Sequence, residues 1–464
     1  SQHRYMATLH LTHTGVAMVL VKGAPETILA MCSREGEWHH NRPLIAHYWQ
    51  QAVQESAMQG QRVLALAAKS VDIQQTTLNA EQMLGGFTIL GLVGIIDPPR
   101  EEAIRAVSLC QSAGIRVKMI TGDHATTAQA IGMQLGIGDG QTSLSGQEIE
   151  RIDVVALQSV VLEKDVFARA SPEHKLRLVE ALQARGEIVA MTGDGVNDAP
   201  ALKRADIGVA MGKKGTEVAK EAAEMVITDD NFASITRAIQ EGRTVYDNIR
   251  KAIMYIMPTN GGEAGMLVIA ILLGMTLPIS PVQILWVNMV TAITLSLSLA
   301  FEKAEPGIMQ HLPRDPSKSI LSGYMIWRIV LVSMFLTIGG LALFLSGQAQ
   351  GMSLEACRTL AVNALVMGEI CYLFNCRYLS ASALSYQGIF GNRYALLAIG
   401  LLAILQLLFT YHPLMQQWFG TADIDLAAWL KILVLGVGLF LIIEFEKWLM
   451  RRHRAASPLY SKHQ

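Results

Sequence analysis

The chain divides by its pattern of apolar positions into two halves. Residues 1–245 mix short apolar runs with polar and charged positions, whereas long apolar runs dominate from Ala252 onward. A helix needs ~20 predominantly apolar residues to cross the hydrocarbon core of a bilayer. Six such runs predict six transmembrane helices, at about 252–273, 279–301, 325–346, 357–376, 393–411 and 427–449.

The first half alternates between strand-like and helix-like patterns. Residues 1–96 predict a mixed α/β region with strands at 16–21 and 62–69 and a strand pair at 87–96. After residue 97 the strands and helices alternate, which is typical of βαβ units and a mostly parallel sheet. The expected order is helix 100–113, strand 115–120, helix 124–135, strand 166–169, helix 172–185, strand 187–192, helix 197–204 and strand 207–211.

Composition agrees with this division and excludes some partners. Hydrophobic residues make up 51% and charged residues 17%, which is unusual for a soluble protein, and the apolar excess lies in the second half. The net charge of −1 argues against a nucleic-acid partner. The five cysteines form no metal-binding spacing, so buried thiols are the default interpretation.

Two acidic residues follow the strand predicted at 187–192. Asp194 and Asp198 lie on a glycine-flanked turn, with Asn197 between them. Open α/β sheets place their chemistry at the carboxyl ends of strands. Carboxylate oxygens there suit Mg²⁺, which combines a few carboxylates with phosphate and water oxygens. A lone GDG would be read as a solvated turn, but the run TGDGVNDAPALK at 192–203 disfavours that reading.

Other candidate residues fall at the same edge of the predicted sheet. The turn Thr121–Gly122–Asp123 follows one strand, and Lys175 lies near the start of a helix that follows another. We expect these turns to meet, because parallel strands end at one edge. The Thr121 hydroxyl and the positive charge of Lys175 could both bind a phosphoryl group. Such residues suit phosphoryl transfer, which needs little more from a protein than positioning and charge neutralisation. Taken alone, Lys175 would be read as a surface lysine.

Polar residues interrupt three of the apolar runs. Asn260 and Glu263 share a face of the first run, near Pro258, and Asn288 and Thr291 repeat that spacing in the second. Glu369 is the only carboxylate in the fourth. Intramembrane carboxylates are costly and normally mark an ion path, although a polar residue that only packs helices together is the alternative.

Six motifs, in the same order along the chain, resemble those of P-type ion-transporting ATPases. TGDGVNDAPALK is similar to the hinge motif of that family, whose phosphorylation domain is of the haloacid-dehalogenase type. The others are KGAPE at 22–26, DPPR at 97–100, TGD at 121–123, SPEHK at 171–175 and PVQILWVNMVT at 281–291.

The resemblance implies an α/β cytosolic part followed by an all-α membrane domain. Residues 1–96 would be the C-terminal part of a nucleotide-binding domain, 97–245 the phosphorylation domain, and 246–464 a stalk and six transmembrane helices. The cofactors would be Mg²⁺ and ATP. Lys22, Gly23 and Arg62 would bind ATP, and Asp194 would bind Mg²⁺. The acyl-phosphate network would comprise Thr121, Gly122, Asp123, Lys175, Asn197 and Asp198. The transported cation would be bound by Asn260, Glu263, Asn288, Thr291 and Glu369.

One family motif is absent. The phosphate-accepting aspartate lies in a DKTGT sequence, and no DKTG occurs in these 464 residues. In the family it would lie upstream of Ser1. We therefore expect a C-terminal part of a longer pump, inactive alone and partnered by the upstream part.

The ion is left open. Calcium pumps carry an aspartate where this chain has Ala292, which leans away from Ca²⁺ and leaves Na⁺, K⁺, H⁺ or Ca²⁺ as cargo. We expect a multi-pass protein in a lipid membrane, of bacterial plasma-membrane type. Lys and Arg gather in alternate loops, and the positive-inside rule places these loops in the cytoplasm. The catalytic part and the C-terminus would be cytoplasmic. Alternatives are a regulatory or phosphatase-like domain with a membrane anchor, a proton pump and a lipid flippase.

Overall fold

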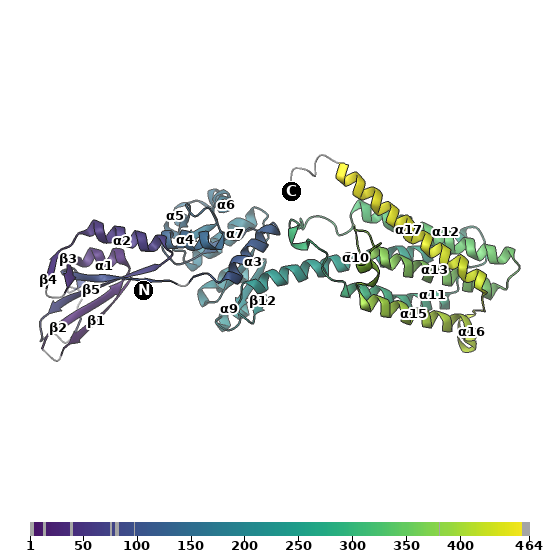
Figure 1. Cartoon of the computed structure of the whole chain (residues 1–464), viewed down its shortest axis with the longest axis horizontal. Coiled ribbons are helices and arrows are strands. Elements are labelled where there is room, and N and C mark those ends of the chain that lie inside the picture. Colours follow the sequence, from purple (N-terminus) through teal and green to yellow (C-terminus); the bar gives the residue numbers. More distant parts are fainter. Residues whose placement is uncertain are drawn as a thin grey trace. The chain divides into compact units, whose positions relative to one another are not determined.

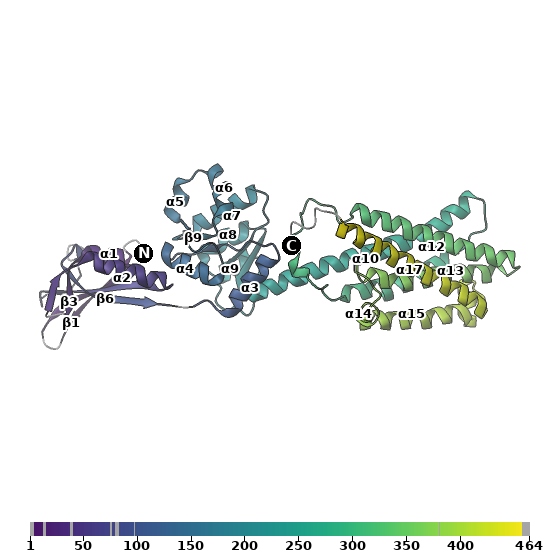
Figure 2. The same cartoon turned by 45° about the horizontal axis from the view of Figure 1, so that its top comes forward.

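A computed structural model describes the fold (Figures 1 and 2). It describes residues 4–12, 15–37, 40–74, 77–78, 83–96, 98–379 and 381–456. Asp97, the first residue of the DPPR motif, lies outside these ranges. The chain separates into two compact units, one of residues 1–237 with 309–312 and one of residues 238–308 with 313–464. The predicted domain boundaries at 96/97 and 245/246 stay predictions.

The first part of the N-terminal unit is a six-stranded sheet with the order β1–β2–β5–β6–β3–β4. Neighbouring strands are antiparallel except β3 and β6. Helices α1 (Pro25–Met31) and α2 (Ala46–Met58) pack on the sheet over an apolar core. The strand pair predicted at 87–96 is wrong, because this segment is one strand that pairs with β5 and β3. The strands are β1 (Tyr5–Leu11), β2 (Ala17–Gly23), β3 (Cys32–Glu37), β4 (His40–Pro43), β5 (Arg62–Val71) and β6 (Phe87–Ile95).

The second part of this unit contains two three-stranded parallel sheets, β7–β9–β8 and β10–β11–β12. The predicted parallel α/β fold is thus confirmed, in two pieces rather than one sheet. The strands are β7 (Met119–Ile120), β8 (Leu144–Ser145), β9 (Val166–Ala168), β10 (Ala190–Gly193), β11 (Ile207–Met211) and β12 (Met225–Ile227). The helices are α3 (Glu101–Ser112), α4 (Ala125–Leu135), α5 (Gly146–Arg151), α6 (Val154–Glu163), α7 (Pro172–Ala184), α8 (Ala199–Arg204) and α9 (Glu217–Ala222).

Several predicted elements differ in length from the observed ones, and two of them lie next to candidate residues. The strand expected at 115–120 is only the two residues of β7. The helix expected from Asn197 begins as a 3-10 turn, Val196–Asp198, before α8 starts. This tight turn aims the Asp198 side chain back toward the end of β10.

The second unit is a bundle of long helices. Helix α13 packs against both α12 and α17. After α11 the chain continues as a π-helical turn, Ala292–Ser296, and a 3-10 turn, Leu299–Phe301. The α-helices are α10 (Ala233–Leu272), α11 (Pro281–Thr291), α12 (Gly323–Ala349), α13 (Leu354–Cys376), α14 (Tyr386–Phe390), α15 (Arg393–Tyr411), α16 (Pro413–Phe419) and α17 (Leu426–Ala456).

Five segments of the described chain are long and apolar enough to cross a membrane, which supports a multi-pass membrane protein. They are Pro281–Phe301, Gly323–Ala349, Leu354–Cys376, Arg393–Tyr411 and Leu426–Arg452. They confirm five of the six predicted spans. The first, 252–273, is helical to Leu272, as the second half of α10. It is not among the five, because Pro258, Asn260, Glu263 and three glycines dilute its apolar character, and it stays a prediction as a span.

Pro258 lies inside α10 without ending it. A proline has no N–H to give to the carbonyl four residues earlier, here that of Met254. The Tyr372 hydroxyl of α13 donates to this carbonyl at 2.8 Å instead. From α12, Ser333 donates to the Pro258 carbonyl at 3.1 Å and Thr337 to that of Gly262 at 3.2 Å. Neighbouring helices thus satisfy the backbone around the proline, as buried helices require.

Candidate functional site

The end of β10 carries a compact ionic network. Lys175, in the first turn of α7, donates from Nζ to Asp198 Oδ1 at 2.5 Å. The other oxygen, Oδ2, accepts from the backbone N–H groups of Asp194 at 3.2 Å and Gly195 at 3.1 Å. The structure thus joins the SPEHK motif to the GDGVND turn, as the sequence predicted.

Burial and hydrogen bonding act oppositely on Asp198, which is 6% exposed. Burial acts to raise its pKa, but hydrogen bonds from Lys175 and the Gly195 N–H outweigh this, so the pKa lies below its usual range. Asp198 is therefore ionised at neutral pH and fixes the lysine in place. Gly193 permits the fit, since a Cβ there would lie 2.5 Å from Asp198 Cβ.

Asp194 and Asn197 occupy the exposed side of the same turn. The Asp194 carbonyl accepts from the Thr216 N–H at 2.9 Å, which holds the backbone while the carboxylate faces outward. Among the described residues, no cluster of three or more His, Cys, Asp or Glu side chains could hold a metal. An accessible carboxylate still fits Mg²⁺, because this ion commonly takes one or two carboxylates and completes its shell with phosphate and water oxygens.

The turn Thr121–Gly122–Asp123 is bonded to the end of β9. Thr121 Oγ1 donates to Asp123 Oδ2 at 3.1 Å and accepts from the Asp123 N–H at 3.1 Å. The Ala170 N–H donates to the Thr121 carbonyl at 3.0 Å, and the Arg169 N–H to that of Asp123 at 3.0 Å. The turn therefore lies beside the segment that leads into α7, although no described hydrogen bond links it to Asp198.

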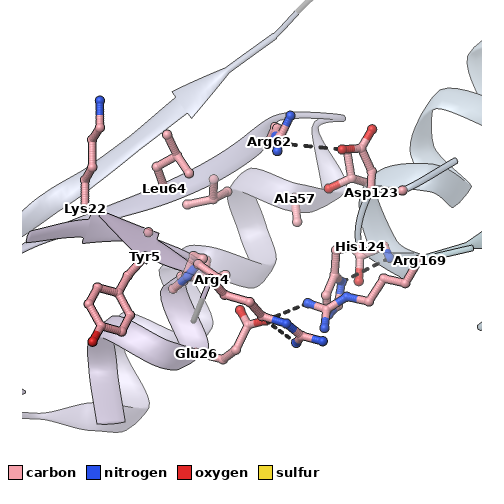
Figure 3. A pocket seen from close by; sticks show the side chains of 18 of the residues that line it. Arg4, Tyr5, Lys22, Glu26, Ala57, Arg62, Leu64, Asp123, His124 and Arg169 are labelled. Carbon is pink, nitrogen blue, oxygen red and sulfur yellow. Dashed lines mark hydrogen bonds and ion pairs between the residues drawn. The ribbon is translucent and has the colours of Figure 1, made fainter. Parts of the chain in front are cut away.

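The predicted ATP residues line one cavity of about 1220 Å³ in the N-terminal unit (Figure 3). Lys22 and Gly23 come from the end of β2, and Arg62 begins β5. Gly122 and Asp123 line the same cavity from the second part of the unit. In Figure 3 the Lys22 amine points away from Glu26 and Arg169.

Two ion pairs cross this cavity (Figure 3). In one the arginine belongs to the first part of the N-terminal unit, and in the other it belongs to the second part. Arg62 Nε lies 3.9 Å from Asp123 Oδ1, and Arg169 Nη2 lies 2.6 Å from Glu26 Oε1. Burial acts to raise the pKa of Glu26, but the hydrogen bond from Arg169 prevails and lowers it. Neither Arg169 nor Glu26 was among the residues predicted for the site. The feature that could have identified Arg169 in the sequence is its position, directly after β9 and just before the SPEHK motif.

The helical unit buries two carboxylates. Glu263 of α10 is 4% exposed and accepts from Asn288 Nδ2 of α11 at 2.8 Å. Glu369 of α13 is 1% exposed, with the Tyr255 hydroxyl 3.5 Å from Oε2. The Thr291 hydroxyl donates to the Val287 carbonyl of its own helix at 2.9 Å. The structure thus joins two of the five predicted cation ligands, Glu263 and Asn288, and buries a third, Glu369, beside Tyr255.

The fifth predicted ligand, Asn260, is exposed on the described part of the chain and joins neither carboxylate there. The side chain of Ala292 lies outside the described set.

The partners of these carboxylates distinguish them from others in the bundle. Glu302 is paired with Arg377 at 2.6 Å, and Glu444 with Lys447 at 2.9 Å. The hydrogen-bond partners described for Glu263 and Glu369 are neutral amide and hydroxyl groups. A buried carboxylate without a cationic partner is costly as an anion, so it favours the binding of a cation or a proton.

Comparisons with known proteins agree with both halves of the chain. A family model described as "Cation transporting ATPase, C-terminus" matches residues 276–449. Models described as "haloacid dehalogenase-like hydrolase" match residues 18–206 and 175–239.

Curated relatives match nearly the whole chain. A "Probable cation-transporting ATPase F" of Mycobacterium tuberculosis is 45% identical over 464 residues, covering 99% of this chain and 51% of that protein. "Cation-transporting ATPase pma1" of Synechocystis sp. is 45% identical over 92% of this chain and 48% of its own length. A "Calcium-transporting ATPase" of Bacillus subtilis is 38% identical, with coverages of 89% and 47%. The chain therefore spans about half the length of the curated relatives it matches.

Proposed function

We propose that this chain, which belongs to the family of P-type cation-transporting ATPases, supplies the Mg²⁺–phosphoryl site and the cation site of an ATP-driven pump. The phosphate-accepting aspartate would be contributed by a DKTGT-containing upstream half. Members of this family use ATP and Mg²⁺, and the exposed Asp194 carboxylate offers the metal a ligand.

The residues at the strand ends would stabilise the transferring phosphoryl group by position and charge. Lys175 carries a positive charge whose place is fixed by Asp198. Asp194 would hold Mg²⁺, which neutralises phosphoryl oxygens when bound. Thr121 offers a hydroxyl and a backbone turn beside them, and Lys22, Gly23 and Arg62 line the cavity that would take ATP.

The observation that carries the transport proposal is the burial of Glu263 against the neutral amide of Asn288. A helix that only anchors a phosphatase to the membrane gains nothing from a costly buried carboxylate. Glu369, which the Tyr255 hydroxyl approaches at 3.5 Å, is a second buried carboxylate whose described hydrogen-bond partner is neutral. This pair of carboxylates would bind the cation or exchange it for protons.

Four ions fit the cluster as cargo: Na⁺, K⁺, H⁺ and Ca²⁺. Neutral ligands around one or two carboxylates suit a monovalent ion. The name of the Bacillus subtilis relative favours Ca²⁺, and a second carboxylate, Glu369, supports that choice. We place the pump in a bacterial-type plasma membrane, with its catalytic part and C-terminus in the cytoplasm.

Ion-dependent ATP hydrolysis tests this proposal in a protein that carries this chain together with the upstream half. Glu263→Gln keeps the size and polarity of the side chain, so ATP binding should persist while stimulation by the cation is lost. Glu355→Gln, at an exposed carboxylate in the first turn of α13, is the matched control and should leave the stimulation unchanged. Unchanged ion dependence in Glu263→Gln would contradict the proposal and favour a phosphatase-like domain with a membrane anchor.

A further inference from the structure

Helix α7 begins with a capping box in which histidine takes the usual place of glutamate. In the common form, a Ser or Thr at the N-cap is paired with Glu or Gln three residues later. Here Ser171 Oγ accepts from the His174 N–H at 3.3 Å, and His174 Nδ1 accepts from the Ser171 N–H at 3.1 Å. The start of α7 therefore depends on an unprotonated imidazole nitrogen.

The ring is buried and closely fitted. His174 is 4% exposed, and its Nε2 lies 3.2 Å from Glu150 Oε1 on α5. A Cβ at Gly146 would come within 2.8 Å of Nδ1, so only glycine leaves space for the ring. In the adjacent helix, Ser145 and Glu148 form the ordinary version of the same box. Helix α5 thus begins with a glutamate-based capping box, and the neighbouring helix α7 begins with a histidine-based one.

These contacts fix the tautomer. Because Nδ1 accepts from a backbone N–H, the proton of the neutral ring lies on Nε2 and is donated to Glu150. A second proton on Nδ1 would face the Ser171 N–H, and two donors cannot bond to each other. Protonation of the His174 ring therefore breaks the cap, and histidine is the side-chain type suited to such a switch between acid and neutral pH.

The charged groups next to the ring are otherwise engaged. The Arg169 guanidinium is paired with Glu26, and Arg177 donates to the Ile152 carbonyl. Lys175 is paired with Asp198, and Glu173 is exposed. Glu150 is the group that contacts the ring directly, and its charge would favour the imidazolium once the cap has opened.

The cap holds the residue that matters for phosphoryl transfer. Lys175 directly follows His174, and its N–H donates to the Ser171 carbonyl at 3.2 Å as a first helical hydrogen bond. We propose that His174 is a positioning residue whose neutral ring keeps Lys175 on Asp198, and whose protonation releases the first turn of α7. The phosphoryl site would then lose its fixed positive charge in acid. This role rests on the function proposed above for Lys175.

Two variants separate capping from titration. His174→Gln keeps an acceptor that restores the common capping box and cannot be protonated near neutral pH. His174→Leu removes the acceptor at every pH. Glu148→Gln, in the capping box of α5, is the matched control because it changes a cap that holds no proposed catalytic residue.

Hydrogen–deuterium exchange on the 464-residue chain in detergent, between pH 5 and 8, reads out the cap without any nucleotide. After correction for the intrinsic pH dependence, exchange at 171–176 in the wild type should accelerate in acid by about fivefold, the order expected from losing one helix cap. His174→Gln should remove this acid response, whereas Glu148→Gln should keep it. His174→Leu should exchange fast throughout.

An identical acid response in the wild type and in His174→Gln would overturn the proposal, and so would full protection in His174→Leu. Phosphorylation by ATP in the protein with the upstream half gives the second readout. Its acid limb should move to lower pH in His174→Gln, and an unmoved limb counts against the proposed role. Failure of the proposed function is distinguishable, because it would show as normal phosphorylation in Lys175→Met, whatever the exchange data.

Discussion

Replacing Lys175 by methionine is the sharpest perturbation of the strand-end network. Methionine keeps the length of the side chain but removes the charge that lies 2.5 Å from Asp198 Oδ1. Of the described hydrogen bonds to Asp198, which is 6% exposed, those from the N–H groups of Asp194 and Gly195 would remain. A buried carboxylate would be left without its cation.

The expected loss follows from the burial of the two partners. Breaking a fully buried pair costs about 3–5 kcal/mol. Because the Lys175 side chain is 21% exposed, water screens part of the interaction. We therefore expect a loss of about 2 kcal/mol, equivalent to roughly 30-fold faster local opening.

The effect should depend on pH with a defined sign. The pKa of Asp198 is lowered in the folded protein, so its contribution to stability is present above the unfolded pKa of about 3.9 and is lost as pH falls through the folded value. Without Lys175 this pKa rises toward its usual range. The two proteins should therefore differ most near neutral pH and converge in acid, where Asp198 is protonated in both.

Amide exchange at Asp194 and Gly195, whose N–H groups bond to Asp198, is the direct assay. Lys203→Met, at an exposed lysine of α8, is the matched control and should leave the rates unchanged. An effect below threefold in Lys175→Met, or an equal effect in the control, would refute the reasoning.

Further predictions concern packing. Gly193→Ala would place a Cβ 2.5 Å from Asp198 Cβ and should cost about 1–3 kcal/mol of stability, as overpacking does, whereas at Gly195 the nearest atom is 3.5 Å away and alanine should cost less; thermal unfolding compares the two. Tyr372→Phe leaves the Met254 carbonyl opposite Pro258 without its 2.8 Å donor and should cost about 1–3 kcal/mol in detergent. Tyr386→Phe, 80% exposed, is its control, and equal melting temperatures would contradict the role given to Tyr372.

The features that the sequence predicted well are those governed by local rules. Five apolar spans follow from the thickness of a bilayer. The expectation that Lys175 and Asp198 belong to one site followed from their places, each just after the carboxyl end of a parallel strand, although β9 and β10 lie in separate sheets. The first span was not confirmed because Pro258, Asn260 and Glu263 lower its apolar character. Its continuity through Pro258 depends on side chains from α12 and α13, which no local pattern encodes.

Other features depend on long-range geometry. The pairs Arg169–Glu26 and Arg62–Asp123 join segments far apart in the chain, so neither could be inferred from local spacing. The capping box at His174 could in principle be predicted from the pattern Ser-x-x-His before a helical segment. Histidine is not the residue expected at that position, however, and only the buried ring reveals its role.

Phosphoenzyme formation from γ-labelled ATP tests the central claim most directly. The 464-residue chain alone should retain no acid-stable, hydroxylamine-labile label, because its sequence has no DKTG. The protein with the upstream half should be labelled, and Asp194→Asn should abolish the label by removing an anionic Mg²⁺ ligand. Near-normal labelling of Asp194→Asn at ordinary Mg²⁺, or acid-stable label on the chain alone, would contradict the account.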